Sequence, residues 1–74
     1  MNDKHQIKAI AANIEALRDQ LTHCASLSSE AFQAIQKGET NQAIGCILDF
    51  GRKLEDALAL YRAAVVLHRD AASN

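Results

Sequence analysis

Three histidines and two cysteines are the residues of this 74-residue chain whose types would suit a metal site or thiol chemistry. They are His5, His23, His68, Cys24 and Cys46. Zinc and similar ions are held by pairs of such residues a few positions apart, so that both ligands lie on one side of a turn or helix. No such pair occurs, because His23 and Cys24 are adjacent and point about 100° apart on a helix. We therefore expect no metal and no cofactor.

The carboxylates do not form a catalytic pattern either. Glu15, Asp19, Glu55 and Asp56 fall on outward positions of the expected helices and are typical of a solvated face. The sequence contains no nucleophile elbow and no phosphate-binding loop. We expect no enzyme activity, no catalytic residue and no small-molecule substrate.

We interpret the cysteines and His68 as structural residues, and Cys46 and His68 each have an alternative role. Cys24 and Cys46 are expected about 12 Å apart along the molecule, too far for a disulfide within one chain. A Cys46 pair between two chains stays open. His68 occupies an apolar seam position, where a polar residue often fixes register, and a pH-sensitive role is its alternative.

Composition favours helices and argues against a membrane protein. The chain has no proline, three glycines and a formal net charge of −1, with charges of both signs interspersed. No run of about 18 apolar residues occurs, so we expect no membrane span. The first residues, MNDKHQIK, are polar and no compact apolar stretch follows them. We therefore expect no signal peptide and a cytoplasmic protein.

Apolar residues recur every three or four positions over two long segments, from Ile7 to Ile35 and from Ile44 to Ala72. This spacing is typical of helices that pack as a coiled coil. The sequence predicts an all-α fold with helices at 4–37 and 40–72. There is no internal repeat, and the length allows a single helical-hairpin domain over residues 1–74.

Residues at the expected helix ends agree with these bounds. Asp3 with Gln6 resembles a capping box at the start of the first helix. Gly38 can take the left-handed conformation that closes a helix, and Thr40 or Asn41 can cap the next one. So short a connection predicts two antiparallel helices.

Facing residues of an antiparallel hairpin have numbers with a constant sum. The apolar seam satisfies this with sums of 78 or 79, as for Leu21 with Leu58 and Ile35 with Ile44. One layer departs from the pattern, since Ser28 faces Gly51. A kink or break of the first helix near residues 25–29 is the alternative there.

The second helix carries a further stripe of small and apolar residues beside the seam. It consists of Ala43, Cys46, Phe50, Ala57, Leu60, Ala64, Leu67 and Ala71. Two helices cannot cover two stripes, and an exposed stripe this long is unusual on a soluble monomer. We expect another chain to cover it, with two hairpins dimerising into a four-helix bundle.

The function that this architecture favours is protein–protein interaction. We expect a non-enzymatic module, such as a small adaptor or co-chaperone-like subunit, whose partner is a second copy of itself or another helical protein. The alternative is a small dimeric regulator that binds RNA or DNA. The architecture is similar in shape to the plasmid copy-control RNA-binding protein, which is also a dimer of hairpins. No motif of its RNA-binding face matches this chain, and the scattered basic residues disfavour nucleic acid as the partner.

Overall fold

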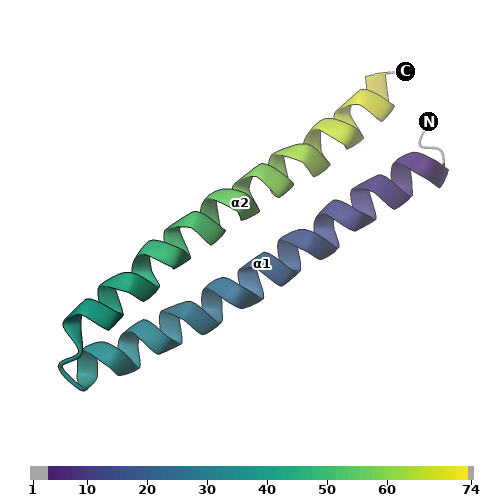
Figure 1. Ribbon diagram of the computed structural model, residues 1–74. Coiled ribbons are helices and arrows are strands. Elements are labelled where there is room, and N and C mark those ends of the chain that lie inside the picture. The colour runs from purple at the N-terminus through teal and green to yellow at the C-terminus, as the bar shows by residue number, and fades with distance from the viewer. Residues whose placement is uncertain (1–3, 74) are drawn as a thin grey trace.

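The fold is a hairpin of two long helices. The computed structural model describes residues 4–73, and the side chains of residues 4–70. Helix α1 (Lys4–Gln36) and helix α2 (Thr40–Ser73) run antiparallel, side by side (Figure 1). Together they measure 55 × 15 × 11 Å. The predicted all-α hairpin is confirmed over these residues, with helix ends within one residue of those expected. Asp3 of the expected capping box lies outside the described residues.

The turn between the helices is closed by the backbone of Gly38. Its φ of 78° is left-handed, as the sequence predicted. The amide of Gly38 donates to the carbonyl of Ile35 at 3.1 Å, and that of Glu39 donates to the carbonyl of Ala34 at 2.9 Å. These two bonds form a Schellman motif, which satisfies carbonyls at the end of α1.

Helix α2 begins slightly earlier than its expected cap. The amide of Ala43 donates to the carbonyl of Glu39 at 3.0 Å, so Glu39 is the residue at which the helical hydrogen bonding starts. The expectation that Thr40 or Asn41 caps this helix is therefore wrong, because Thr40 is already its first helical residue.

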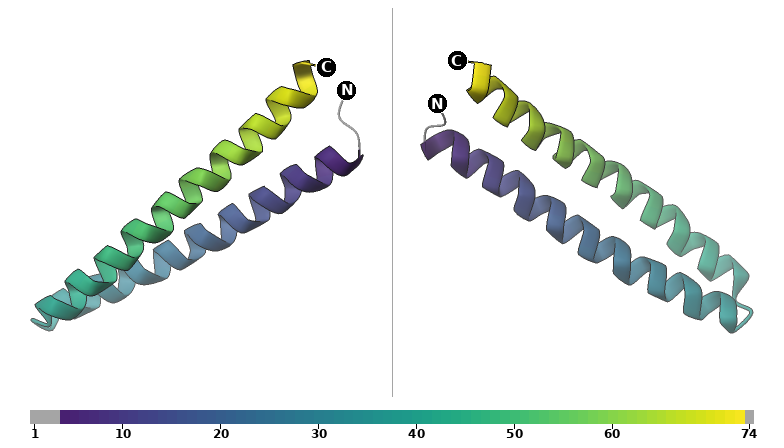
Figure 2. Two further views of the ribbon diagram at one scale, coloured as in Figure 1. Left: turned by 45° about the horizontal axis from the view of Figure 1, so that its top comes forward. Right: turned by 180° about the vertical axis from the view of Figure 1, so that it is seen from behind.

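Helix α1 continues through the segment where a break was the alternative. Lys4–Gln36 is one helix, and both views in Figure 2 show its ribbon passing through the middle of the hairpin without interruption. The hydroxyl of Ser28 donates to the carbonyl of Ala25 at 2.8 Å, which occupies the hydroxyl without displacing the helical backbone. The unbroken phase of the apolar pattern across residues 25–29 thus corresponds to a continuous helix.

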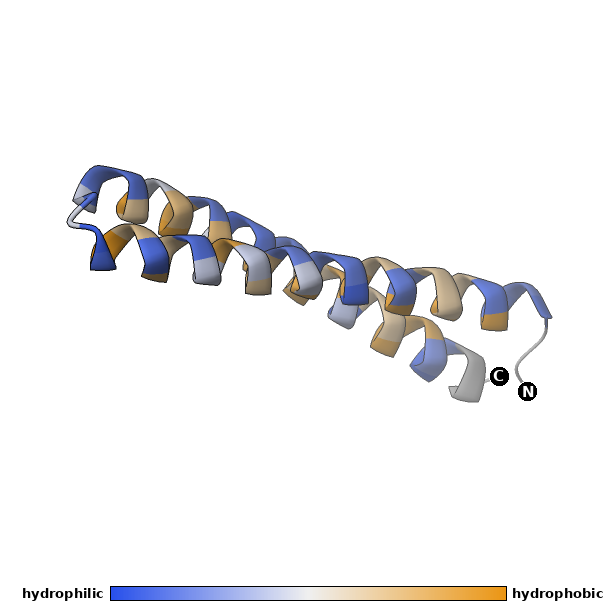
Figure 3. Cartoon of the chain, turned by 90° about the horizontal axis from the view of Figure 1, so that it is seen from below, coloured by the Kyte–Doolittle hydropathy of each residue, from blue (hydrophilic) through white to orange (hydrophobic). Residues whose placement is uncertain are grey.

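Small side chains make up the contact between the helices. The buried residues among those described are Cys24, Ala31, Ala34, Ala43 and Ala57, which we call the small-residue core. No large side chain is fully buried there. Figure 3 shows that hydrophobic positions recur turn after turn along both helices, alternating with hydrophilic ones. The hairpin therefore has more apolar surface than its own two helices cover.

On α2 the two apolar stripes have exchanged the roles that the sequence suggested. The stripe expected to be uncovered lies against α1, with Ala43 and Ala57 buried. The large residues of the seam expected between the helices are exposed, for instance Leu21 and Leu58, although Cys24 and Ala31 of the same seam are buried on α1. Alanines allow two helix backbones to approach closely over many turns, whereas a row of leucines and isoleucines would hold them apart. Residue size thus accounts for which stripe faces inward.

Hydrogen bonds explain why α1 tolerates polar residues on its inward side. Gln20 Nε2 donates to Asp56 Oδ2 at 3.4 Å, and Gln6 Nε2 donates to the carbonyl of Leu67 at 3.4 Å. The thiol of Cys24 lies 4.0 Å from the carbonyl oxygen of Phe50. These long bonds join the helices along most of their length, so the inward side of α1 needs fewer apolar residues than that of α2.

Candidate interaction surface

One side of the hairpin gathers large apolar side chains that are left in solvent. We call it the large-residue face. It comprises Ile7, Ile14, Leu21, Phe32 and Ile35 of α1, and Ile44, Ile47, Leu54, Leu58 and Tyr61 of α2. Each of these residues keeps between 45% and 61% of its surface exposed. Single exposed apolar residues are ordinary, but a set this large from both helices exceeds the apolar patches that soluble monomers usually expose.

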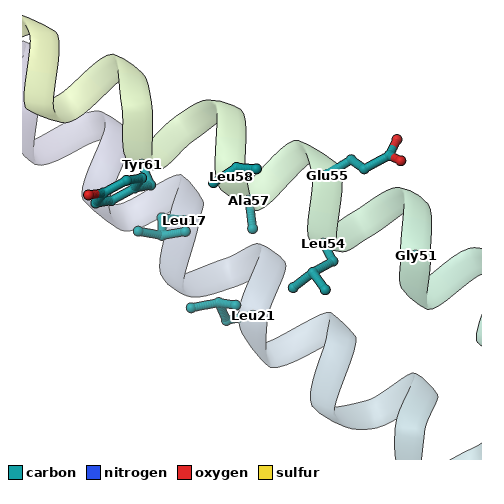
Figure 4. A pocket seen from close by; sticks show the side chains of 8 residues that line it. All are labelled: Leu17, Leu21, Gly51, Leu54, Glu55, Ala57, Leu58 and Tyr61. Carbon is teal, nitrogen blue, oxygen red and sulfur yellow. The ribbon is translucent and has the colours of Figure 1, made fainter.

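A hollow near the middle of this face is lined by large apolar side chains on its sides and by small residues at its base. Leu17 and Leu21 of α1 and Leu54, Leu58 and Tyr61 of α2 line it from opposite sides (Figure 4). Two smaller residues also line it, the buried Ala57 and the half-buried Gly51. A Cβ atom added at Gly51 would meet nothing within 4 Å. The hollow is therefore shaped to receive an apolar side chain.

A second hollow of the same construction lies nearer the turn. Buried Ala31 and Ala43 line it together with larger exposed residues, among them Phe32, Ile35 and Ile47. Both hollows combine small-residue core positions with walls from the large-residue face. Alternating small and large positions of this kind accept the knobs of a facing helix.

The hollows also test the predicted register. Leu21 with Leu58, and Leu17 with Tyr61, line one hollow, and Ile35 with Ile44 line the other. The hydrogen bonds between the helices, however, join residues whose numbers add to 73–76, as for Cys24 with Phe50 and Gln20 with Asp56, so the helices are offset by about one turn from the predicted sums of 78 or 79. Ser28 and Gly51, expected to face each other, accordingly line different hollows. His68, expected to face Ile10 in the seam, is exposed.

Charged residues border the large-residue face on both helices. Glu55 lines the central hollow, and in Figure 4 its carboxylate points away from the leucines to the outer edge of α2. Arg62 follows seven residues later, at the same edge of the helix by its periodicity. Arg18 occupies the corresponding edge of α1, beside Ile14 and Leu21. The apolar face thus has a charged rim.

The polar side of the hairpin offers no comparable site. A shallow hollow there is lined by residues of both charges, including Asp49, Arg52, Lys53 and Asp56, and by His23. Arg52 Nη2 lies 2.6 Å from Asp49 Oδ1, and Gln20 donates to Asp56. Because acids alternate with bases, this side does not form the basic patch that binds a phosphate backbone.

The histidines and cysteines are dispersed over the two helices. His5, His23 and His68 are exposed, Cys24 is buried, and Cys46 is half-buried. The thiol of Cys46 lies 3.9 Å from Glu30 Oε2. Within the described part of the chain, no three residues of the metal-binding types lie close enough together to hold an ion.

The interface residues expected from sequence occupy the contact within the hairpin. Ala43 and Ala57 are buried, and five others are half-buried: Cys46, Phe50, Leu60, Ala64 and Leu67. Ala71 belongs to α2, but its side chain lies outside those described. In a single hairpin α1 therefore covers Ala43 and Ala57 of this stripe and covers the other five described members only in part.

Sequence reasoning missed two members of the exposed apolar surface altogether. Leu48 and Val66 are 64% and 48% exposed, and neither belongs to a regular seam. Side-chain volume, compared between the two stripes, could have predicted the large-residue face from the sequence. On α2 the exposed stripe holds leucine, isoleucine and tyrosine at most positions, whereas the covered one alternates alanine with larger residues such as Phe50 and Leu60.

Comparisons with known proteins return no match. No protein-family model matches the chain, and no curated protein and no solved structure matches it. Over residues 4–73, neither helix has a stretch long and apolar enough to cross a membrane. We therefore infer function from the surface of the hairpin.

Proposed function

We propose that this hairpin is a protein–protein interaction module without catalytic activity, and that the large-residue face is its binding surface. One observation carries the proposal. The side chains that the hairpin buries are alanines and a cysteine, while the ten residues of the large-residue face are each at least 45% exposed. A chain that depended on its own core for stability would have the reverse arrangement.

The size of the face supports this proposal. The hairpin is 55 Å long and 15 Å wide, so one flat side covers about 800 Å², which is the area that each partner contributes to a stable interface. Short single domains bury too little surface to be comfortably stable and often gain stability by association. Covering the face with two further helices would complete a four-helix bundle, the form in which we propose that the module acts.

The cytoplasm is the compartment that we propose for this activity. Cys24 and Cys46 are free thiols in the hairpin. Free thiols of this kind persist where the environment is reducing. An adaptor or co-chaperone-like subunit is the class of protein to which we assign the module, by analogy with other small helical hairpins.

A pair of leucine variants tests the proposal. Leu58 lines the central hollow, and Leu48 on the same helix is also exposed but does not line the central hollow or the one near the turn. We expect Leu58→Glu to abolish the association shown by the parent, because it places a charge in an apolar interface. Leu48→Glu should retain it. Sedimentation velocity and native mass spectrometry, with nuclease treatment, measure both.

Two outcomes would contradict the proposal. If Leu58→Glu and Leu48→Glu both associate as the parent does, the large-residue face is not the binding surface. If association of the parent is lost on nuclease treatment, nucleic acid is the partner and the RNA- or DNA-binding alternative replaces the proposal.

A further inference from the structure

The area and the composition of the large-residue face indicate which partner covers it. We propose that a second copy of this chain covers the face, so that two hairpins form a closed symmetric pair of four helices. The proposal rests on the proposed function, because it names the partner at the same face.

A single hairpin exposes more surface than a folded chain of its mass usually does. Its accessible surface is 5524 Å², whereas folded monomers of this mass expose about 4,500 Å². Two copies stacked face to face can overlap along the whole 55 Å length, whether their turns lie at the same end or at opposite ends. Burial of about 800 Å² on each chain would bring its exposed surface close to the ordinary value. The total of about 1,600 Å² is the size of a standard stable interface.

The composition of the face is that of a permanent interface. None of its ten residues is charged, and the hydroxyl of Tyr61 is the only polar group among their side chains. Partners that bind and separate meet through surfaces about as polar as the rest of the molecule, whereas homodimers and other permanent complexes meet through more apolar ones. The face therefore suits a partner that stays bound.

The face also carries both parts of a helix-packing contact. The central hollow and the hollow near the turn open on it, while side chains such as Phe32, which is 61% exposed, protrude from it. Two identical surfaces interlock only if each supplies recesses as well as protrusions. A second copy would place its apolar side chains in the hollows of the first and receive side chains in return.

Charge does not oppose the association of two copies. The formal net charge of the chain is −1, and the rim of the face carries both signs, with Glu55 as well as Arg18 and Arg62. Two copies therefore repel each other little, and the rim lacks the field of a single sign that steers an oppositely charged partner. This balance suits a partner with an equally weak net charge, which a second copy has.

The mass and the stability of the purified, nuclease-treated chain test for the second copy. Sedimentation velocity at micromolar concentrations should give the mass of two chains. Native mass spectrometry of mixed isotopically labelled and unlabelled chains should show pairs that contain one of each. The midpoint of thermal unfolding should rise with protein concentration, because unfolding then separates the two chains.

Leucine variants locate the contact. Leu21 and Leu58 line the central hollow, whereas Leu48 is 64% exposed and lines neither that hollow nor the one near the turn. Leu21→Ala and Leu58→Ala should each weaken dimerisation on the order of a hundredfold or more, since every dimer loses two large apolar side chains. Leu58→Met keeps most of the apolar volume and should retain the dimer. Leu48→Ala is the matched control and should change the affinity only a few-fold.

Helix content, measured by circular dichroism at several concentrations, shows whether each variant folds. If Leu21→Ala and Leu58→Ala lose helix and recover it as the concentration rises, folding is coupled to dimerisation and the proposal is supported. A loss that concentration does not reverse would mean that these leucines stabilise the hairpin itself, and it would overturn the proposal.

Three further results would overturn the proposal. A folded parent with the mass of one chain and a midpoint independent of concentration excludes the second copy, while Leu58→Glu and Leu48→Glu still report whether another protein binds the face. A dimer that Leu48→Ala weakens and Leu58→Ala does not places the contact on another surface, and the proposed function then fails as well. Masses above two chains that grow with concentration indicate open, head-to-tail association instead of a closed pair.

Discussion

Gln20 Nε2 lies 3.4 Å from Asp56 Oδ2 and donates a side-chain hydrogen bond that joins the middle of α1 to the middle of α2. Gln20 is half-buried and Asp56 is exposed, so the bond lies at the polar edge of the contact between the helices. It shows that a polar residue inside an otherwise small and apolar seam is matched by a partner on the facing helix. The position of Gln20 therefore contributes to the register of the hairpin as well as to its stability.

Removing this bond should weaken the hairpin modestly. We expect Gln20→Ala to lower the free energy of unfolding by about 0.5–1 kcal/mol, the net value of an ordinary hydrogen bond. Gln33→Ala, at an exposed position of the same helix, is the control and should change stability less. Urea denaturation at one fixed protein concentration measures both, because association would otherwise shift the midpoint. Equal effects of the two substitutions would mean that the bond contributes nothing.

The small-residue core should not accept larger side chains without a loss of stability. Ala57 is 3% exposed between the helices, so we expect Ala57→Leu to force them apart and to cost about 1–3 kcal/mol. Ala59 is exposed two residues away, and Ala59→Leu should have little effect. Thermal unfolding followed by circular dichroism compares the two variants. A hairpin that accepts leucine at residue 57 without loss of stability would show that the helices do not depend on close approach.

Gly38 and Gly45 should respond to alanine in opposite directions. Gly38 has a φ of 78°, which alanine adopts only with strain, so Gly38→Ala should cost about 1 kcal/mol. Gly45 lies inside α2, where an added Cβ meets nothing within 4 Å, and Gly45→Ala should raise stability by about 0.5–1 kcal/mol. Chemical denaturation of the two variants gives the signs. If Gly38→Ala is as stable as the parent, the left-handed turn does not contribute to stability.

The two thiols should differ in reactivity. Cys24 is 4% exposed, whereas Cys46 is half-buried. A thiol reagent such as an aromatic disulfide should therefore modify Cys46 first and reach Cys24 only when the hairpin opens. Cys24→Ser and Cys46→Ser variants assign the two kinetic phases. Two equally fast phases in the native protein would contradict the burial of Cys24.

Much of the hairpin follows from the sequence by local rules. The three- and four-residue spacing from Ile7 onward predicts two long helices, and Gly38 predicts the turn that separates them. The constant sum of facing numbers, as for Leu21 with Leu58, predicts the register to within about one helical turn of the one that the bond from Gln20 to Asp56 shows. Each of these inferences depends on periodicity or on the conformational freedom of one residue, both of which are readable along the chain.

The choice of the inward stripe does not follow from periodicity. Two stripes on one helix have the same spacing and differ by a rotation about the helix axis, so the pattern alone leaves open which of them meets the other helix. The outcome depends on how closely the backbones approach, which alanines at positions such as Ala31 and Ala57 permit. It also depends on bonds such as Gln20 to Asp56, which make a polar position acceptable inside the contact. Hydrophobicity favours the larger residues for burial, and here that preference indicated the wrong face.

The small-residue core has a consequence for how the chain would tolerate random substitution. In a saturation library, positions such as Ala31, Ala34 and Ala57 would accept glycine or serine more readily than valine or phenylalanine, so their tolerance would be ordered by volume. Positions of the large-residue face, such as Leu54 and Leu58, would instead accept other bulky apolar residues and reject charged ones. The two patterns of accepted residues, each recurring along the same helix, would therefore distinguish the contact within the hairpin from the proposed binding surface.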